Sequence, residues 1–271
     1  MKNLFLLSIL LITINGCNGQ KTNSVTNTKT TTLKDKSLVK KTEEITTKES
    51  VSKDSVVNDD SSYEDDIEVA ISQSFQKRDS EILETAISKV EKDLKISLNY
   101  KTYWKTYLYY NLSLLYTALK DDDKASFTID TAIETIEEKA NSSEDFALLA
   151  ACKSFSLKFA NMTKLASISA EVGELANKSL ELNPKNMRAY YVLATNNFYT
   201  PKMFGGMVKV EEYSLKALDC PYSISENYYA PYWCKPKVYQ IYIQYLNMEK
   251  KESEAKKIKE KAKKEFPNSN F

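Results

Sequence analysis

Residues 109–132 of the chain read YYNLSLLYTALKDDDKASFTIDTA and contain two helical patterns on either side of a short polar turn. Before the turn, large and small residues recur every three or four positions, which places them on one face of a helix. They are Tyr109, Leu112, Ser113 and Tyr116. After the turn, Ala125, Ile129 and Ala132 repeat this spacing in the order small, large, small. The stretch therefore predicts two amphipathic helices that pack closely in opposite directions.

The chain from residue 63 onward continues the helical pattern. Residues 63–183 contain no proline and a single glycine, Gly173, and apolar side chains recur there at three- and four-residue spacing. No stretch alternates for long enough to predict a β-strand. Polar breaks divide the pattern into helices, and they lie near residues 77–79, 120–123, 140–143 and 161–163. We therefore expect residues 63–271 to form an all-α domain.

The helix pair in residues 109–132 resembles a unit of the tetratricopeptide (TPR) repeat, in which small residues let two antiparallel helices approach closely. A looser match lies in residues 239–262, and residues 179–194 contain the end of one unit and the start of another. The residues that carry the first of these matches are Tyr239, Tyr242, Ile243, Leu246, Ala255 and Ala262. Those that carry the second are Asn183-Pro184, Tyr190, Leu193 and Ala194. The resemblance covers residues 64–270 and implies about five antiparallel helix pairs in a right-handed solenoid. An unrelated helical bundle is the alternative.

The first seventeen residues resemble the signal peptide of a bacterial lipoprotein. A positively charged start precedes an apolar run at residues 4–14, which is too short to span a bilayer as a helix. The tetrad Ile14-Asn15-Gly16-Cys17 follows and resembles a lipobox, although Asn15 departs from the usual small second residue. The resemblance implies a diacylglycerol on Cys17. We therefore expect a lipid-anchored protein of the bacterial cell envelope, at the outer membrane or periplasmic face, with an ordinary secretory signal as the alternative.

The segment between this signal and the helical domain is polar. It is rich in Ser, Thr and Lys and contains no aromatic residue, so it cannot bury enough apolar surface to fold. The predicted organisation is a lipoprotein signal peptide at residues 1–16, a disordered tether at 17–62 and a TPR-like helical domain at 63–271.

The composition argues against catalysis and against nucleic-acid binding. The chain of 271 residues contains no histidine and only five glycines. There is therefore no imidazole base and no histidine metal ligand, and no glycine-rich phosphate loop occurs. A net charge of +1 lacks the basic excess of a nucleic-acid-binding protein. We therefore expect no enzyme, no cofactor, no bound metal and no nucleic-acid partner.

Two irregular segments interrupt the helical pattern. Residues 200–207 contain Pro201 and the pair Gly205-Gly206, which allow a sharp turn or a close approach of the backbone. We expect Phe204 to pack into the core there, and a ligand contact is the alternative.

The second irregular segment, residues 219–236, contains three prolines and two cysteines. In an oxidising exterior compartment, Cys220 and Cys234 form a candidate disulfide, and two unpaired thiols are the alternative. Cys152 lies on an apolar helix face, where we expect a small core residue.

The TPR resemblance also implies which side chains face the concave groove that holds peptides or partner proteins in that family. The candidate groove residues are Tyr107, Tyr110, Arg188, Tyr191, Thr195, Gln240 and Gln244. A mixture of tyrosine and polar side chains suits a peptide or protein ligand. The functional hypothesis is a membrane-anchored, non-catalytic scaffold or adaptor that binds an envelope protein or peptide. A small-ligand-binding lipoprotein component of a solute-uptake system is the alternative.

Overall fold

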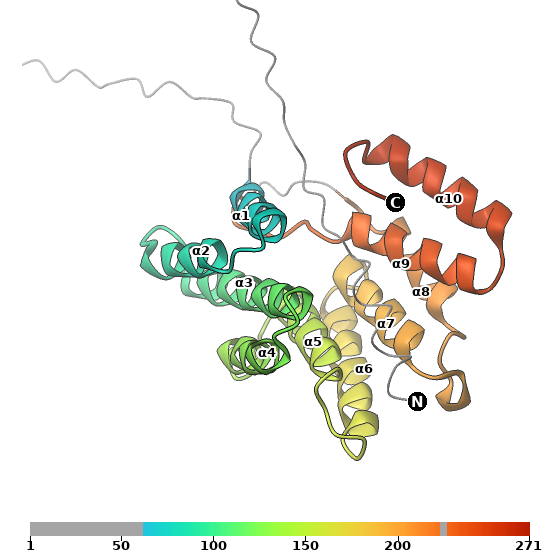
Figure 1. The fold of residues 1–271 in the computed structure, drawn as a ribbon, viewed down its shortest axis with the longest axis horizontal. Helices are drawn as coiled ribbons and strands as arrows, with labels where there is room; N and C mark the ends of the chain where they lie inside the picture. Colours follow the sequence, from blue (N-terminus) through green and yellow to red (C-terminus); the bar gives the residue numbers. More distant parts are fainter. Residues whose placement is uncertain (1–61, 223–226) are drawn as a thin grey trace, which may run out of the picture. The chain divides into compact units, whose positions relative to one another are not determined.

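A computed structural model describes residues 62–222 and 227–271 of the chain. Within these residues the protein is all-α, with ten α-helices, one short 3₁₀ helix (η2, Lys202–Phe204) and no β-strand (Figure 1). The α-helices are α1 (Tyr63–Lys77), α2 (Glu81–Lys92), α3 (Leu98–Ala118), α4 (Asp122–Ile136), α5 (Ser143–Ser156), α6 (Leu165–Leu182), α7 (Met187–Tyr199), α8 (Val210–Asp219), α9 (Lys235–Met248) and α10 (Glu252–Glu265). The predicted signal peptide, Cys17 and all but the last residue of the predicted tether lie outside the described residues.

The breaks predicted from the sequence fall between helices, and side-chain caps explain several of these boundaries. At the start of α5, Ser142 Oγ accepts the backbone N–H of Asp145 at 3.1 Å, while the Asp145 carboxylate accepts the N–H of Ser142 at 3.0 Å. Asp121 caps α4 and Asn186 caps α7 with single bonds of the same kind. Each cap satisfies an N–H group that the helix itself cannot reach, which stabilises the helix by about 1 kcal/mol.

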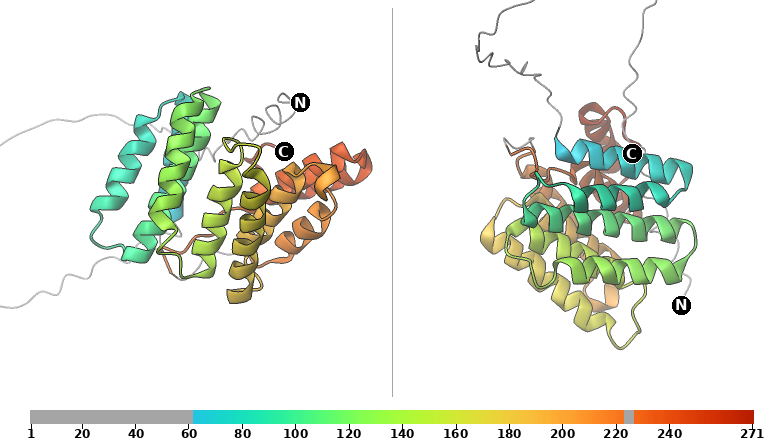
Figure 2. Two further views of the ribbon diagram at one scale, coloured as in Figure 1. Left: turned by 90° about the horizontal axis from the view of Figure 1, so that it is seen from below. Right: turned by 90° about the vertical axis from the view of Figure 1, so that its left-hand side faces the viewer.

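Consecutive helices pack against one another in chain order, and the odd-numbered helices from α1 to α9 also contact each other in turn. In the right-hand view of Figure 2, α1, α2, α3 and α4 lie one below another. The closest packing is within α3–α4, α5–α6 and α7–α8. The five odd-numbered helices, α1, α3, α5, α7 and α9, therefore share one face, which we call the odd-helix face.

The α3–α4 pair packs as its residue spacing predicts. Ala125, Ile129 and Ala132 of α4 are fully buried, whereas Phe127 on another face of the same helix is 75% exposed. Ser113 of α3 is also fully buried, and its hydroxyl donates to the carbonyl oxygen of Ala125 at 2.5 Å. Two small residues at this point allow the backbones of the two helices to approach closely.

The irregular segment after α7 contains the close approach that its glycines suggested, but the expected burial of Phe204 is wrong. A Cβ on Gly206 would lie 1.7 Å from the carbonyl oxygen of Thr200, and Gly205 has a φ of +85°, which favours glycine. Phe204 is 72% exposed. The backbone N–H of Met207 donates to the carbonyl oxygen of Asn197, so the chain turns back and buries Met207 in the core instead.

We expect Ile129→Ala to lower the free energy of unfolding by about 2–4 kcal/mol, because it leaves a cavity between α3 and α4. The matched control is Phe127→Ala on the same helix, which should change the free energy by less than about 0.5 kcal/mol because its side chain is exposed. Equilibrium unfolding in urea measures both. Equal losses in the two variants would contradict the assignment of the buried face of α4.

Candidate functional site

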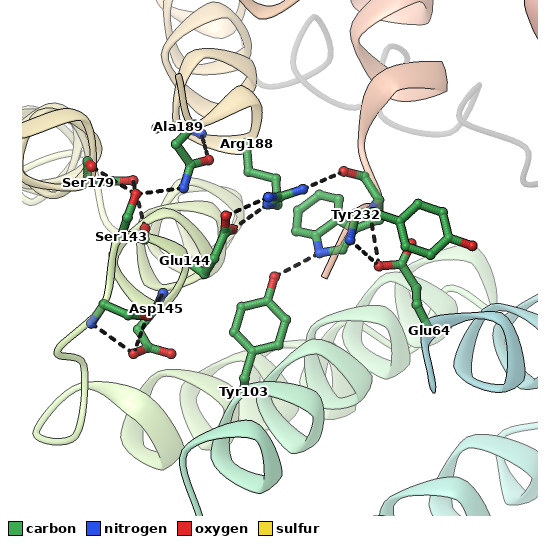
Figure 3. A network of polar contacts seen from close by, with 12 residues as sticks. Glu64, Tyr103, Ser143, Glu144, Asp145, Ser179, Arg188, Ala189 and Tyr232 are labelled. Carbon is green, nitrogen blue, oxygen red and sulfur yellow. Dashed lines mark hydrogen bonds and ion pairs between the residues drawn. The ribbon is translucent and has the colours of Figure 1, made fainter. Parts of the chain in front are cut away.

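An irregular segment, residues 227–234, lies across the odd-helix face, and we call it the strap. It belongs to the connection between α8 and α9. In Figure 3 the strap lies between Arg188 of α7 and Glu64 of α1, with Tyr103 of α3 beside it. Side chains from three helices that are far apart in the sequence therefore meet at one short piece of chain.

The odd-helix face holds the strap largely through its backbone. The indole N–H of Trp104 donates to the carbonyl oxygen of Tyr229 at 3.0 Å, and Arg188 Nη1 donates to that of Trp233 at 3.0 Å. In the other direction, the backbone N–H groups of Tyr232 and Trp233 both donate to Glu64 Oε2, at 2.7 and 3.0 Å. These groups recognise peptide N–H and C=O groups, which every non-proline residue supplies.

The side chain of Trp233 is the apolar centre of the site and is only 4% exposed. Its ring stacks on Tyr107 with the centroids 4.9 Å apart, and its indole N–H donates to the hydroxyl of Tyr103 at 2.8 Å. Lys237 Nζ lies 4.9 Å from the centroid of the Trp233 ring and donates to the Tyr107 hydroxyl at 3.2 Å. The site thus combines aromatic stacking, a cation–π contact and satisfied hydrogen bonds.

Arg188 is buried as an ion pair with Glu144 of α5. Its Nη2 donates to Glu144 Oε1 at 2.5 Å, and its Nε donates to the other carboxylate oxygen. Burial alone would lower the pKa of Arg188, but the charge of Glu144 outweighs it and the pKa is raised. The guanidinium is therefore charged at every physiological pH, and its remaining donor group binds the strap.

Glu64 is the other buried ionisable group of the site. Burial first, and then the charge of Glu68, raises the pKa of Glu64 to about 8, although the two strap N–H groups and Arg188 act in the opposite direction. The carboxyl group is therefore mostly protonated at neutral pH. A carboxyl in a protein interior with this pKa is a pH-dependent element of the strap site.

The structure brings four of the candidate groove residues together around the end of the strap. Tyr107 and Arg188 contact Trp233 directly, and Tyr110 and Tyr191 lie near Cys234. Three of these side chains are buried and Tyr110 is half-buried, so the strap fills the surface that they line.

The other candidate groove residues lie further along the same elements. Thr195 is half-buried one turn after Tyr191 on α7. Gln240 and Gln244 are half-buried on α9, and Gln240 Nε2 donates to the carbonyl oxygen of Asn270 at 3.2 Å. Among the described contacts, neither glutamine touches the strap.

The candidate disulfide between Cys220 and Cys234 is not formed in the structure, where both residues and Cys152 are buried free thiols. The Cys220 thiol donates to the carbonyl oxygen of Lys216 at 3.2 Å, so it points back along α8. Burial raises the pKa of all three thiols. They are therefore protonated and weakly nucleophilic.

Four residues of the site carried no signal in the sequence, namely Glu64, Tyr103, Trp104 and Glu144. Each stands in an ordinary helical pattern, and its role depends on a strap that is distant in the chain. Glu64, for example, bonds residues 168 and 169 positions away. Only a long-range contact between α1 and the strap could have identified it.

A second surface feature is a shallow cleft of about 580 Å³ beside the α3–α4 pair. Half of its eight lining residues are aromatic or aliphatic, namely Tyr109, Leu112, Tyr116 and Phe127, and the others are Asp123, Lys124, Thr128 and Thr131. Over residues 62–222 and 227–271, no group of three or more Cys, Asp or Glu side chains is placed to hold a metal ion. Within the same residues, none of the helices is both long enough and apolar enough to cross a bilayer.

Comparison of the chain with protein-family models, with curated proteins and with solved structures finds no match.

We expect the stability of the protein to fall as the pH rises from about 4.5 to about 8, because native Glu64 keeps its proton over this range while the unfolded chain releases it. The unfolded state then binds fewer protons, so the free energy of unfolding decreases by up to about 1.4 kcal/mol per pH unit. Glu64→Gln keeps the shape of the side chain without the titration. It should remove this slope in urea unfolding curves measured across the range.

The matched control for this experiment is Glu81→Gln on α2, an exposed residue, which should keep the slope of the unmodified protein. A Glu64→Gln variant with an unchanged slope would show that another group causes the pH dependence.

Proposed function

We propose that the protein is a membrane-anchored, non-catalytic adaptor of the bacterial cell envelope, with TPR-like helix pairs that bind a partner protein or peptide. In this proposal a lipid on Cys17 anchors the chain, residues 17–62 tether it, and the helix pairs from residue 63 onward form a right-handed solenoid. The partner binds on the odd-helix face.

The packing of the helices supports the TPR-like part of the proposal. The residues that match the repeat in sequence lie where two helices touch, with Ala125 and Ala132 fully buried against α3. Each odd-numbered helix contacts the next odd-numbered helix as well as its own partner. Such nearest-neighbour contacts are expected for stacked helix pairs.

The binding of the strap is the single observation that supports peptide binding in this proposal. Trp104, Arg188 and Glu64 bind its backbone C=O and N–H groups, and Tyr107 stacks on its tryptophan. A partner peptide offers the same groups and fits the same donors and acceptors. We therefore interpret the strap as an internal ligand that covers the parts of α1, α3 and α7 that it contacts and leaves the part of α9 that carries Gln240 and Gln244 to a partner.

A photo-crosslinking amino acid at Gln240 or Gln244 tests this proposal in cells. Both residues lie on α9 beyond the strap and are half-exposed. We expect either position to capture one specific envelope protein, and Trp233→Ala to increase the yield because a loosened strap competes less for the face.

The control position is Lys256, an exposed residue of α10 on an even-numbered helix, where the same probe should capture no specific partner. Capture of the same protein from all three positions, or no capture at Gln240 and Gln244, would overturn binding at the odd-helix face.

The cleft beside α3 and α4 favours the second candidate function, a small-ligand-binding component of a solute-uptake system. Its volume of about 580 Å³ is within the usual range of small-molecule sites, and its lining combines four aromatic or aliphatic residues with four polar or charged ones. A rise in melting temperature with a metabolite, lost in Phe127→Ala, would favour this function over the adaptor, because ligand binding stabilises the folded state by mass action.

The anchor has a test of its own. We expect mass spectrometry of the mature protein to find Cys17 at the N-terminus with a diacylglyceryl group, and Cys17→Ser to abolish this modification. A mature chain that begins elsewhere without lipid would contradict the anchor and would leave the odd-helix site unaffected.

A further inference from the structure

Three turns of the helical body form one continuous border, which we call the turn edge. They are residues 157–164 after α5, 200–209 after α7 and 248–251, which begin with the last residue of α9. An ion pair at 2.7 Å joins Lys202 of the second turn to Glu249 of the third. Near the first turn, Asn196 at the end of α7 donates to the carbonyl oxygen of Ser169 near the start of α6 at 3.3 Å. In Figure 1 the three turns follow one another from the bottom of the helical body to its right-hand side.

The turn edge exposes an unusual number of large apolar side chains. Five of them have between 60% and 84% of their surface exposed, and they are Met162, Met203, Phe204, Val208 and Met248. Three of the five lie in the single turn after α7. Isolated exposed apolar residues are common, but a cluster on one border marks a surface that contacts something apolar.

The same turns carry a positive charge. They contain six lysines and one glutamate, and three of the lysines form salt bridges, namely Lys158 with Asp122, Lys202 with Glu249 and Lys251 with Glu211. Lys164, Lys209 and Lys250 are exposed and form no salt bridge among the described residues. The apolar side chains are therefore flanked by cations that are free to bind an anionic surface.

This combination fits the surface of an anionic bilayer better than the surface of a protein. The apolar side chains project from turns at the ends of helices and do not line a groove, so they can enter the acyl region while the backbone stays outside it. Lysine side chains are long enough to reach the phosphate groups above an inserted residue. Each lysine near an anionic leaflet adds electrostatic attraction.

We propose that the turn edge is a membrane-contacting surface, in which Phe204, Met203 and Val208 enter the interface of an anionic bilayer and the neighbouring lysines bind its headgroups. The inference rests on the proposed anchor only for bringing the domain close to a membrane. A lipid on Cys17, separated from α1 by residues 17–62, would hold the domain near the bilayer without orienting it. The turn edge would fix which side of the domain faces the lipid.

Fluorescence quenching tests the inference. The mature full-length protein with Phe204→Trp is mixed with phosphatidylcholine vesicles that contain phosphatidylglycerol and brominated acyl chains. We expect the signal of the added indole to be lost by quenching, because it enters the acyl region. The matched control is Phe127→Trp, an equally exposed position on α4 outside the turn edge, whose added signal should persist.

A charge-reversal pair tests the lysines. Lys164→Glu combined with Lys209→Glu should abolish the quenching of the Phe204→Trp variant, whereas Lys256→Glu combined with Lys263→Glu on α10 makes the same charge change elsewhere and should preserve it. Equal quenching in vesicles without phosphatidylglycerol would overturn the role of the lysines.

Equal quenching of the Phe204→Trp and Phe127→Trp variants, or none in either, would overturn the membrane contact itself. This outcome is distinct from a failure of the anchor, because the lipid on Cys17 is measured separately by mass spectrometry. If mass spectrometry finds no lipid on Cys17 and the Phe204→Trp variant is still quenched, the absent lipid contradicts the anchor while the quenching supports the turn edge.

Discussion

The arrangement of the odd-numbered helices depends on the hydrogen bonds that Glu64 and Arg188 make to the backbone of the strap. In an array of helix pairs each pair contacts mainly its neighbours, so distant pairs are coupled only weakly. The strap is an exception, because it bonds both α1 and α7, which are not neighbours on the odd-helix face. Loss of the strap would leave Arg188 Nη1 and the Glu64 carboxyl group buried without these hydrogen-bond partners, at a cost of about 1–3 kcal/mol for each unpaired group. The strap thus makes the first and seventh helices part of one cooperative unit.

The abundance of tyrosine has a physical explanation in the same place. A buried tyrosine fills volume with its ring and bonds with its hydroxyl, so it can satisfy polar groups inside an apolar site. Tyr103 accepts the indole N–H of Trp233, and Tyr107 donates to Glu68 at 2.6 Å while it stacks on the same tryptophan. Phenylalanine at these positions would fill the space and leave the indole N–H or the carboxylate without a partner. The aromatic residues of the odd-helix face therefore hold a polar segment in a buried position.

The sequence predicted what depends on local spacing and missed what depends on distant contacts. The face of α4 that contains Ile129 follows from helix periodicity alone, whereas the selection of Tyr107 and Arg188 as groove residues also needed the resemblance to the TPR repeat. The strap itself could not be predicted, because its partner Trp104 lies 125 residues from Tyr229 in the chain. The burial of Phe204 was predicted wrongly for a related reason. The turn contains two apolar residues, Phe204 and Met207, and helical spacing does not show which of them is buried. The hydrogen bonds of the turn place Met207 in the core and leave Phe204 exposed.

The contacts of the strap also restrict the kind of partner that could replace it. Trp104 and Arg188 are donors that need free carbonyl oxygens, and Glu64 is an acceptor that needs free N–H groups. A helical partner uses its backbone groups internally and could offer these residues only its ends. A helix docked here would therefore leave buried polar groups unpaired, at a cost of about 1–3 kcal/mol for each. A non-helical peptide pairs them all, and an aromatic side chain at the position of Trp233 would restore the stack on Tyr107. Under the proposed function, the odd-helix face would therefore favour an unfolded or loop segment with an aromatic residue, even though most of the hydrogen bonds that it makes are to backbone groups.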